Sequence, residues 1–586
     1  MRQWMVAAKK ADFYAIAEKF HVDPVVARII RNREVIGEKN IRIYLGGNLS
    51  DLSDPHQMKD MDRLVEILAQ KIRKQAHIRI IGDYDVDGVT SSHLFLTALR
   101  RVGAKVDVVI PHRIQDGYGL SLHLLQQAKE DGVDTILTCD NGIAAIDEIA
   151  WAKAQKMTVL VTDHHAVPFE EHEGRRTEKK SLADAVVNPH QQDCGYPYKE
   201  LCGAGVAWNV IRVLYENYDM DKREAEDLLD FVAMATVCDV MSLTGENRIL
   251  VKEGLKRIRH TKNIGLQALM QACNVQPENI SAYHFGYVLG PCVNATGRLD
   301  TARHALRLFE TGQETEAEEI ARDLVDLNQE RKELTLQGVE MAKKLCEEGG
   351  YEKDPVLVLF LPDVHESIAG LIAGRIREMY NRPVFVLTRG EEGVKGSGRS
   401  TENYSMYENM CGCAELFTKF GGHPMAAGLS LPEENVEKFR RKINENCPLT
   451  VEEVCPDIHI DMAMPVGYAS TELVHQFALL EPFGKDNPSP LFADRNLSIS
   501  RMWVIGKNRN VLRMSVLSEY GQPVPVIFFG DVETLFAYFT EKFGQEEVEN
   551  ALHGRKNRIL FSMVYTAKID FYQGNENLQL EMKYYR

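Results

Sequence analysis

Apolar runs and amphipathic segments alternate along the chain between residue 77 and about residue 190. The amphipathic segments, such as 91–102 and 143–155, carry apolar residues at the spacing of a helix face. The apolar runs have the length of buried strands and cover 77–82, 105–110, 135–139, 157–162 and 185–188. This alternation of strand and helix predicts an α/β fold with a parallel, doubly wound sheet.

Helical patterns flank this region on both sides. Residues 1–75 are predicted to be mostly helical, most clearly from Met61 to Lys74. Residues 203–237 also show a helical pattern, and the mostly apolar stretch 228–237 is expected to be buried. Residues 313–348 are rich in charge, with apolar residues at heptad-like steps, and a helix over that range would be ~54 Å long. Such a helix fits a strut between two domains, and a helix packed inside one domain fits the same pattern.

A second α/β pattern follows, with a strand at 356–361, a helix at 365–380 and a strand at 383–387. From about residue 466 the chain changes to short apolar runs separated by Gly and Asn turns. That change predicts a small β-barrel at the end of the sequence.

Net charge and cysteine spacing restrict the classes of protein to which this chain can belong. The net charge is −16, which argues against indiscriminate nucleic-acid binding but leaves room for a local basic groove. The 11 cysteines are scattered without a Cys-x-x-Cys pair, which argues against a zinc ribbon. Scattered cysteines, no signal peptide and no apolar run of membrane-spanning length predict a cytoplasmic protein with no membrane contact.

The first predicted strand ends in three acidic residues at alternate positions, Asp83, Asp85 and Asp87. In an extended chain these side chains point the same way, so their carboxylates repel unless a cation lies between them. Oxygen ligands at this position favour Mg²⁺ or Mn²⁺. Asp residues that cap a turn, or a calcium loop, are the alternatives. A standard EF-hand is excluded because Leu94 stands where its Glu is needed.

Later elements also end in residue types that bind metals. Asp140 follows the third strand, His164 and His165 follow the fourth, and Asp239 ends a helix. The carboxyl ends of parallel strands meet at one edge of a sheet, so we expect these groups to converge with the first three acids. Carboxylates with imidazole favour a hydrolytic centre with two ions, and imidazole shifts the preference toward Mn²⁺. An isolated His-His pair is more often structural, so the prediction depends on the whole set.

These segments resemble the four signature motifs of the DHH phosphoesterase superfamily, in the order Asp83-Tyr-Asp-Val-Asp-Gly88, Thr138-Cys-Asp-Asn-Gly142, Asp163-His-His165 and Asp239. Within it, the chain is similar to the RecJ family, whose members are 5′→3′ exonucleases specific for single-stranded DNA. Colinear segments such as Leu201-Cys-Gly-Ala-Gly205, Asn294-Ala-Thr-Gly-Arg298 and Gly396-Ser-Gly-Arg-Ser400 extend the resemblance from about residue 70 to the end.

The resemblance implies two Mn²⁺ or Mg²⁺ ions. Their ligands would be Asp83, Asp85, Asp87, Asp140, His164 and Asp239, with His165 as a ligand or a contact to the scissile phosphate. His164, His165 and Asp140 are the implied catalytic residues. The expected reaction is hydrolysis of a phosphodiester that releases 5′-mononucleotides.

The resemblance also implies a domain order and a substrate path. The parts are an N-terminal helical segment (1–75), a DHH catalytic domain (76–312), a connecting helix (313–350), an α/β DHH-associated domain (351–465) and an OB-fold domain (466–586). A pocket for the terminal nucleotide is expected from Asn294, Arg298, Ser397, Arg399, Ser400 and His423, and a Gly-rich turn with surface arginines is the alternative. In the barrel, Arg501, Lys507 and Arg509 lie near Trp503, which suits single-strand binding. A solvated barrel surface is the alternative there.

The predicted function is therefore that of a single-strand-specific DNA exonuclease in repair and recombination. The expected partners are single-stranded DNA, a helicase and a single-strand-binding protein, and the expected state is a monomer. Two other functions fit parts of the pattern. One is a DHH phosphoesterase acting on short oligoribonucleotides, cyclic dinucleotides or pyrophosphate, and the other is a relative that binds single strands without cleaving them.

Overall fold

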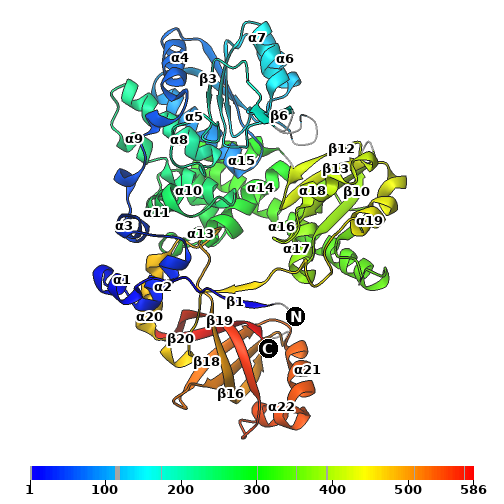
Figure 1. The fold of residues 1–586 in the computed structure, drawn as a ribbon. Helices are drawn as coiled ribbons and strands as arrows, with labels where there is room; N and C mark the ends of the chain where they lie inside the picture. The colour runs from blue at the N-terminus through cyan, green and yellow to red at the C-terminus, as the bar shows by residue number, and fades with distance from the viewer. Residues whose placement is uncertain are drawn as a thin grey trace. The chain divides into compact units, whose positions relative to one another are not determined.

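The computed structural model describes residues 3–112, 116, 119–172, 175–299, 301–351, 353–390, 393–506, 509–572 and 574–586. These residues form two compact units (Figure 1). The first unit contains residues 48–456, and the second joins residues 3–47 to residues 457–586. The segment 1–75, predicted as one helical part, is thus divided between the two units.

A five-stranded parallel sheet lies at the centre of the first unit. Its order is β3-β2-β4-β5-β8, and each neighbouring pair is parallel, which confirms the predicted sheet. The strands are β2 (His77–Ile81), β3 (Lys105–Val109), β4 (Thr135–Cys139), β5 (Thr158–Thr162) and β8 (Ala185–Val187). A hairpin of β6 (Phe169–His172) and β7 (Arg175–Glu178) precedes β8.

Helices cover both faces of this sheet (Figure 1). On one face, α4 (Met61–Arg73), α5 (Val86–Arg101) and α8 (Gly203–Asn217) pack on strand residues that include Ile80 and Leu160. On the other face, α6 (Leu122–Glu130) and α7 (Ile146–Ala154) pack on Ile81 and Val161. Neighbouring residues of one strand therefore enter different cores, as the alternation of side chains along a strand requires.

A helical layer follows the sheet. The almost fully buried α10 (Leu229–Cys238) confirms the buried helix predicted over 228–237. Around it lie α9 (Arg223–Glu226), α11 (Gly245–Ile258), α12 (Ile264–Ala272), α13 (Ala282–His284), a π-helical turn (Phe285–Leu289), α14 (Gly290–Leu299) and α15 (Ala302–Glu310).

A single helix of 35 residues, α16 (Glu314–Glu348), leads out of this layer. Its first half contributes residues such as Ala317 and Leu324 to the core of the sheet domain. Its second half contributes Val339 and Ala342 to a different core, shared with α17 (Ala369–Tyr380). The helix therefore connects two cores, as a strut between two domains does, and is not packed inside one domain.

The second α/β layer is a mixed sheet of order β12-β13-β11-β10-β9. Only β9 and β10 are parallel, and the other neighbouring pairs are antiparallel. Its strands are β9 (Leu357–Phe360), β10 (Val384–Gly390), β11 (Gly393–Arg399), β12 (Lys419–His423) and β13 (Ala426–Leu431), and its other helices are α18 (Met406–Cys411) and α19 (Val436–Glu445).

The second unit is a β-barrel with helical additions. Its sheet runs β15-β16-β17-β18-β20-β19, and a pairing of β16 with β19 closes it, as the predicted barrel requires. The strands are β15 (Met462–Ala463), β16 (Phe492–Ile505), β17 (Val511–Leu517), β18 (Pro523–Phe529), β19 (Leu560–Tyr572) and β20 (Asn575–Tyr585). Several strands are longer than the predicted short ones, and α21 (Val532–Phe543) and α22 (Gln545–Leu552) separate β18 from β19.

The N-terminal residues complete this second unit. β1 (Trp4–Val6) pairs in parallel with β14 (Ile458–Ile460). Buried residues of α1 (Phe13–Phe20), α2 (Pro24–Asn32) and α3 (Glu38–Gly46) join the core that contains α20 (Thr471–Phe477) and the barrel interior. None of the helices in the described part of the chain has the length and apolar content that crossing a bilayer would need.

Candidate metal centre

The loop after β2 carries Asp83 and Asp85, and Asp87 lies in the first turn of α5. Asp85 caps α5, because its Oδ1 accepts hydrogen bonds from the backbone N–H groups of Asp87 (2.9 Å) and Gly88 (3.1 Å). Helix α5 therefore begins at Val86, earlier than the predicted residue 91, and the three acids do not lie on one extended strand as we expected. Gly88 is required here because a Cβ atom would collide with the backbone of Asp83.

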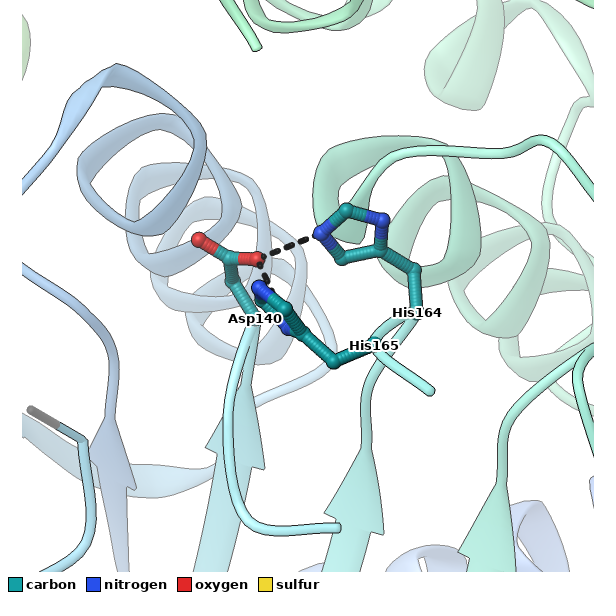
Figure 2. Close-up of side chains that lie close together, drawn as sticks. All are labelled: Asp140, His164 and His165. Carbon is teal, nitrogen blue, oxygen red and sulfur yellow. Dashed lines mark ion pairs between the residues drawn. The ribbon is translucent and has the colours of Figure 1, made fainter. Parts of the chain in front are cut away.

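The ends of the next elements bring further ligand types to the same place. Asp140 follows β4 in a left-handed conformation, with a φ of 60°. The Nε2 atom of His164, after β5, lies 3.1 Å from Asp140 Oδ1, 3.6 Å from Asp239 Oδ2 and 3.7 Å from Asp87 Oδ2. In Figure 2 dashed lines join Asp140 to the imidazoles of His164 and His165, and Asp140 Oδ1 lies 4.0 Å from His165 Nδ1.

All seven residues predicted for the metal site are brought together. Their ligand atoms form three overlapping groups, in each of which the atoms lie within 4.8 Å of one another. The groups are Asp83 with Asp85 and Asp140; Asp87 with His164 and Asp239; and Asp140 with His164 and His165. Asp140 and His164 each belong to two groups, so the arrangement suits two neighbouring ions.

The electrostatics of the cluster also favour bound cations. Burial raises the pKa of the Asp83 and Asp140 carboxyls well above their usual range, and neighbouring carboxylates raise both further. The Oδ1 atom of Asp83 is buried and has no hydrogen-bond partner among the residues that the structure describes. Carboxylate oxygens gathered with one or two imidazoles match the ligand chemistry of Mn²⁺ and Mg²⁺.

The start of α8 holds one of these acids in position. The backbone N–H groups of Gly203 and Ala204 donate to Asp87 Oδ2 (2.6 Å) and Oδ1 (2.7 Å). Two donors at the positive end of a helix fix the position of this carboxylate. A Cβ atom on Gly203 would lie 2.6 Å from the Cβ atom of Asp140, so only glycine allows this close approach.

Sequence reasoning missed two residues that orient His165. Asp163 Oδ1 accepts from His165 Nδ1 at 2.8 Å, and its Oδ2 accepts from the Ile143 backbone N–H at 2.9 Å. Burial lowers the pKa of His165, but this hydrogen bond and the nearby carboxylates outweigh it and raise the pKa to about 9. Asn188 Nδ2 donates to the backbone carbonyl of His165 at 2.9 Å. The signal available for Asp163 was its place at a strand end, directly before the His pair.

A pocket of 570 Å³ lies next to the metal loop. Tyr84, which separates Asp83 from Asp85, lines it together with Arg298, Ser397 and Arg399. Sequence reasoning missed some of its polar lining, which includes Tyr84, Thr388, Lys395 and Lys419.

The other residues predicted for this pocket lie elsewhere. Ser400 is fully buried and its hydroxyl donates to the carbonyl of Tyr404 at 2.6 Å. His423 ends the exposed strand β12 and is not part of the lining. Asn294 Oδ1 accepts from the Val86 backbone N–H at 3.1 Å, so it supports the metal loop.

The barrel presents part of the predicted single-strand surface. Arg501 is exposed on β16, with its guanidinium 5.8 Å from the centre of the Trp503 ring. Trp503 and Arg513 line a groove of 260 Å³. Arg509 is exposed in the turn after β16, and Lys507 lies outside the described residues.

Three family models match the chain. The DHH family, N-terminal domain, matches residues 77–236, the DHHA1 domain matches 353–447 and the RecJ OB domain matches 460–584. These matches confirm the predicted fold class, including the OB-fold of the barrel.

Curated relatives match over most of the chain. The single-stranded-DNA-specific exonuclease RecJ of Haemophilus influenzae is 32% identical over 582 residues, covering 96% of each chain. The protein of the same name from Escherichia coli is 31% identical over 582 residues and covers 95% of each chain. The one from Bacillus subtilis is 33% identical over 512 residues, and there the match spans 63% of the relative's length.

Solved structures agree with the fold. A crystal structure of RecJ in complex with Mn²⁺ from Thermus thermophilus superposes with a TM-score of 0.81 at 25% identity, covering 100% of this chain and 79% of that one. A crystal structure of exonuclease RecJ bound to manganese has a TM-score of 0.56 at 32% identity, covering 66% of this chain and 94% of that one.

Proposed function

Since the chain belongs to the RecJ family of single-stranded-DNA-specific exonucleases, we propose that it shortens single-stranded DNA from the 5′ end and releases 5′-mononucleotides. The observation that carries this proposal is the convergence of all seven predicted ligands at one rim of the parallel sheet. A non-catalytic relative would not need to keep this full set.

The residues divide into two groups of ligands. Asp83, Asp85 and Asp140 would hold one ion, and Asp87, His164 and Asp239 would hold the other. Bound Mn²⁺ or Mg²⁺ supplies positive charge that activates a water molecule and stabilises the charge of the reacting phosphate.

His165 is suited to contact the scissile phosphate. Its Nδ1 is bound to Asp163, so Nε2 is the nitrogen that would face a substrate. The Asp163 carboxylate raises the pKa of His165 and so favours the protonated imidazole, whose Nε2 would offer a charged N–H donor to a phosphate oxygen. Asp163 acts on the reaction through His165 and is therefore a positioning residue.

The pocket beside the metal loop would select the end of the strand. Arg298 and Arg399 can bind a terminal phosphate with paired N–H groups, and Lys419 adds positive charge. Lys395 also lines the pocket, where it forms an ion pair with Glu366 at 2.8 Å. Tyr84 lies both in the metal loop and in this lining, so a phosphate held here is next to the metal centre. An anchored 5′ phosphate beside the cleavage site explains why the product would be a mononucleotide.

The barrel would bind the rest of the strand without regard to sequence. An exposed arginine beside an exposed tryptophan contacts phosphate through charge and a base through stacking. An enzyme that needs single strands depends on other proteins to open duplex DNA, so we infer that it works with a helicase and a single-strand-binding protein. We further propose that it is a monomer and that it acts in repair and recombination.

The experiment that tests the proposal is a time course on end-labelled DNA with each metal. We expect 5′-mononucleotides from a single strand with Mn²⁺ or Mg²⁺, no cleavage of a blunt duplex and no cleavage after chelation. An intact single strand with fresh Mn²⁺ would refute the exonuclease. Faster turnover of a dinucleotide than of a long strand would instead indicate a phosphoesterase for short substrates.

A further inference from the structure

Two cysteines lie side by side away from the metal centre. Cys273 directly follows α12, and Cys292 lies in the first turn of α14. Their Sγ atoms are 3.7 Å apart, which is within contact distance. Both cysteines are free thiols in the structure.

The pair lies where three helices of the first unit meet. Asn328 on α16 donates from Nδ2 to Cys292 Sγ at 3.3 Å. The side chain of Arg331, one turn further along α16, donates from Nε and Nη2 to Asn328 Oδ1, at 3.1 and 2.8 Å. Cys292 therefore links α12, α14 and the long helix α16 through its sulfur atom.

The two thiols differ in access and in acidity. Cys273 is half-buried, and the hydrogen bond from Cys292, together with the charge of Lys332, lowers the pKa of its thiol in spite of burial. Cys292 is 2% exposed, and its hydrogen bond to Cys273, together with burial, raises its thiol pKa. Cys273 is thus the thiol that meets a small oxidant first, and Cys292 is placed to react second.

We propose that Cys273 and Cys292 are an oxidative modification site, at which a peroxide converts the two thiols into a reversible disulfide. The Cys273 thiol gives up its proton, and the thiolate attacks one peroxide oxygen, breaks the O–O bond and becomes a sulfenic acid. The other oxygen leaves as hydroxide and takes up that proton to form water. The Cys292 thiol then attacks this sulfur, displaces the hydroxyl as a second water and forms the S–S bond. Each sulfur loses one electron, and the peroxide takes up both.

Closing this bond draws the Cys292 sulfur away from Asn328 on α16, and we expect α14 to shift with it. A disulfide needs an S–S distance of about 2.05 Å, so the sulfur atoms must approach by more than ~1.5 Å. Asn294, two residues after Cys292, supports the metal loop through Val86, and Arg298 reaches the pocket, where its Nη1 donates to the Ser367 carbonyl at 2.6 Å. A shift of α14 therefore reaches both parts of the site, and oxidation is expected to slow cleavage.

The first test is chemical and does not depend on activity. The reduced full-length protein is treated with a small excess of hydrogen peroxide without metals, the peroxide is removed, and peptides are mapped without reductant. We expect a peptide pair joined through Cys273 and Cys292, lighter by two hydrogen atoms, that separates again with dithiothreitol. Oxidation of the exposed Cys411 with no such pair would overturn the proposal.

The second test measures cleavage and rests on the proposed function. We expect the oxidised protein to cleave about tenfold more slowly or worse, because a misplacement of about 1 Å can have such an effect, and dithiothreitol to restore the rate. C273S should keep the reduced rate and escape inhibition, whereas the control C411S should be inhibited like the parent.

Equal inhibition of C273S and the parent, or a mapped disulfide with an unchanged rate, would overturn the link to α14. A reduced protein that does not cleave at all would instead refute the proposed exonuclease, while peptide mapping would still decide the disulfide.

Discussion

Asp140 is one of the two residues, with His164, on which most of the metal centre depends. Its carboxylate belongs to two of the three groups of ligand atoms, and its left-handed backbone is fixed by the end of β4. Replacing it with Asn keeps the shape and removes the charge, so both ions would be held less tightly.

We expect D140N to reduce the cleavage rate at least ~100-fold, since even the loss of a group that only orients a metal ligand costs 10–100-fold. Affinity for single-stranded DNA, measured by fluorescence anisotropy, should stay within about twofold, because the barrel supplies that binding. D147N, an exposed acid in the first turn of α7, is the matched control. An equal loss of binding and cleavage in D140N would contradict this division of roles.

Arg399 should act on the end of the strand. We expect R399A to weaken binding of a strand with a 5′ phosphate about tenfold or more, because a hydrogen bond to a charged group contributes ~1.5–3 kcal/mol. Binding of the same strand with a 5′ hydroxyl should change little. R375A, which removes an exposed arginine of α17, is the control. An equal effect on both strands would show that Arg399 does not recognise the terminal phosphate.

Asp230 makes stability depend on pH. Burial raises the pKa of its carboxyl to about 6, although the Thr261 hydroxyl and the Phe231 backbone N–H donate to it. The folded state therefore holds a proton that the unfolded state releases at lower pH, and the free energy of unfolding falls as pH rises from about 4 to about 7.

We expect D230N to remove the pH-dependent part of the free energy of unfolding that comes from Asp230, which amounts to about 3 kcal/mol. Urea unfolding of both proteins across this range, with chelator, gives the measurement. The difference in free energy of unfolding between D230N and the parent should grow with pH, and parallel pH profiles would contradict the raised pKa.

At the scale of elements, the start of α8 approaches the metal ligands closely. Gly203 supplies an N–H donor to Asp87 and leaves space for Asp140. We expect G203A to keep the helix and the donor but to displace Asp140, so that cleavage falls ~100-fold with an unchanged circular dichroism spectrum.

G205A is the matched control for this prediction. A Cβ atom there lies 3.4 Å from Leu201, an ordinary contact, and alanine favours a helix by about 1 kcal/mol over glycine. Comparable activity of G203A and G205A would show that the approach of α8 to Asp140 has no role.

The elements also explain which parts of the site could be predicted. Strand periodicity and the rule that strand ends meet at one edge were sufficient to bring Asp140 and His164 to the three acids. Gly203 positions Asp87 through its backbone N–H, and Asp163 positions His165 through its carboxylate. Such supporting contacts carry no periodic signal, so sequence reasoning did not assign these two residues a role.

The pocket shows a second limit. The sequence places Ser397, Arg399 and Ser400 in the pocket for the terminal nucleotide, with a Gly-rich turn as the alternative, and most of the segment is strand β11. Alternate residues of a strand face opposite sides, so Ser397 and Arg399 line the pocket while Gly398 faces the core near Phe385. The side of the sheet that each residue faces could not be predicted without recognising the strand.

At the scale of the whole molecule, the candidate metal centre and the proposed strand-binding surface of the barrel belong to different units. We expect R501A and W503A each to weaken binding of a long single strand, W503A by about tenfold, since stacking on one aromatic side chain contributes ~1–3 kcal/mol. R501A should also reduce the salt dependence by about one phosphate contact. Cleavage of a dinucleotide should not change. K542A, on the exposed face of α21, is the control. If K542A weakened binding of the long strand as much as R501A, the effect would be one of overall charge.

The second unit is assembled from two stretches at opposite ends of the chain. β1 needs β14 as its partner, and the apolar sides of α1, α2 and α3 need the barrel core. During translation, these helices leave the ribosome long before residues 457–586 exist. In a stalled nascent chain the apolar sides of these N-terminal helices therefore stay exposed to solvent. Chaperones and proteases can bind them there, even when the catalytic domain has already folded.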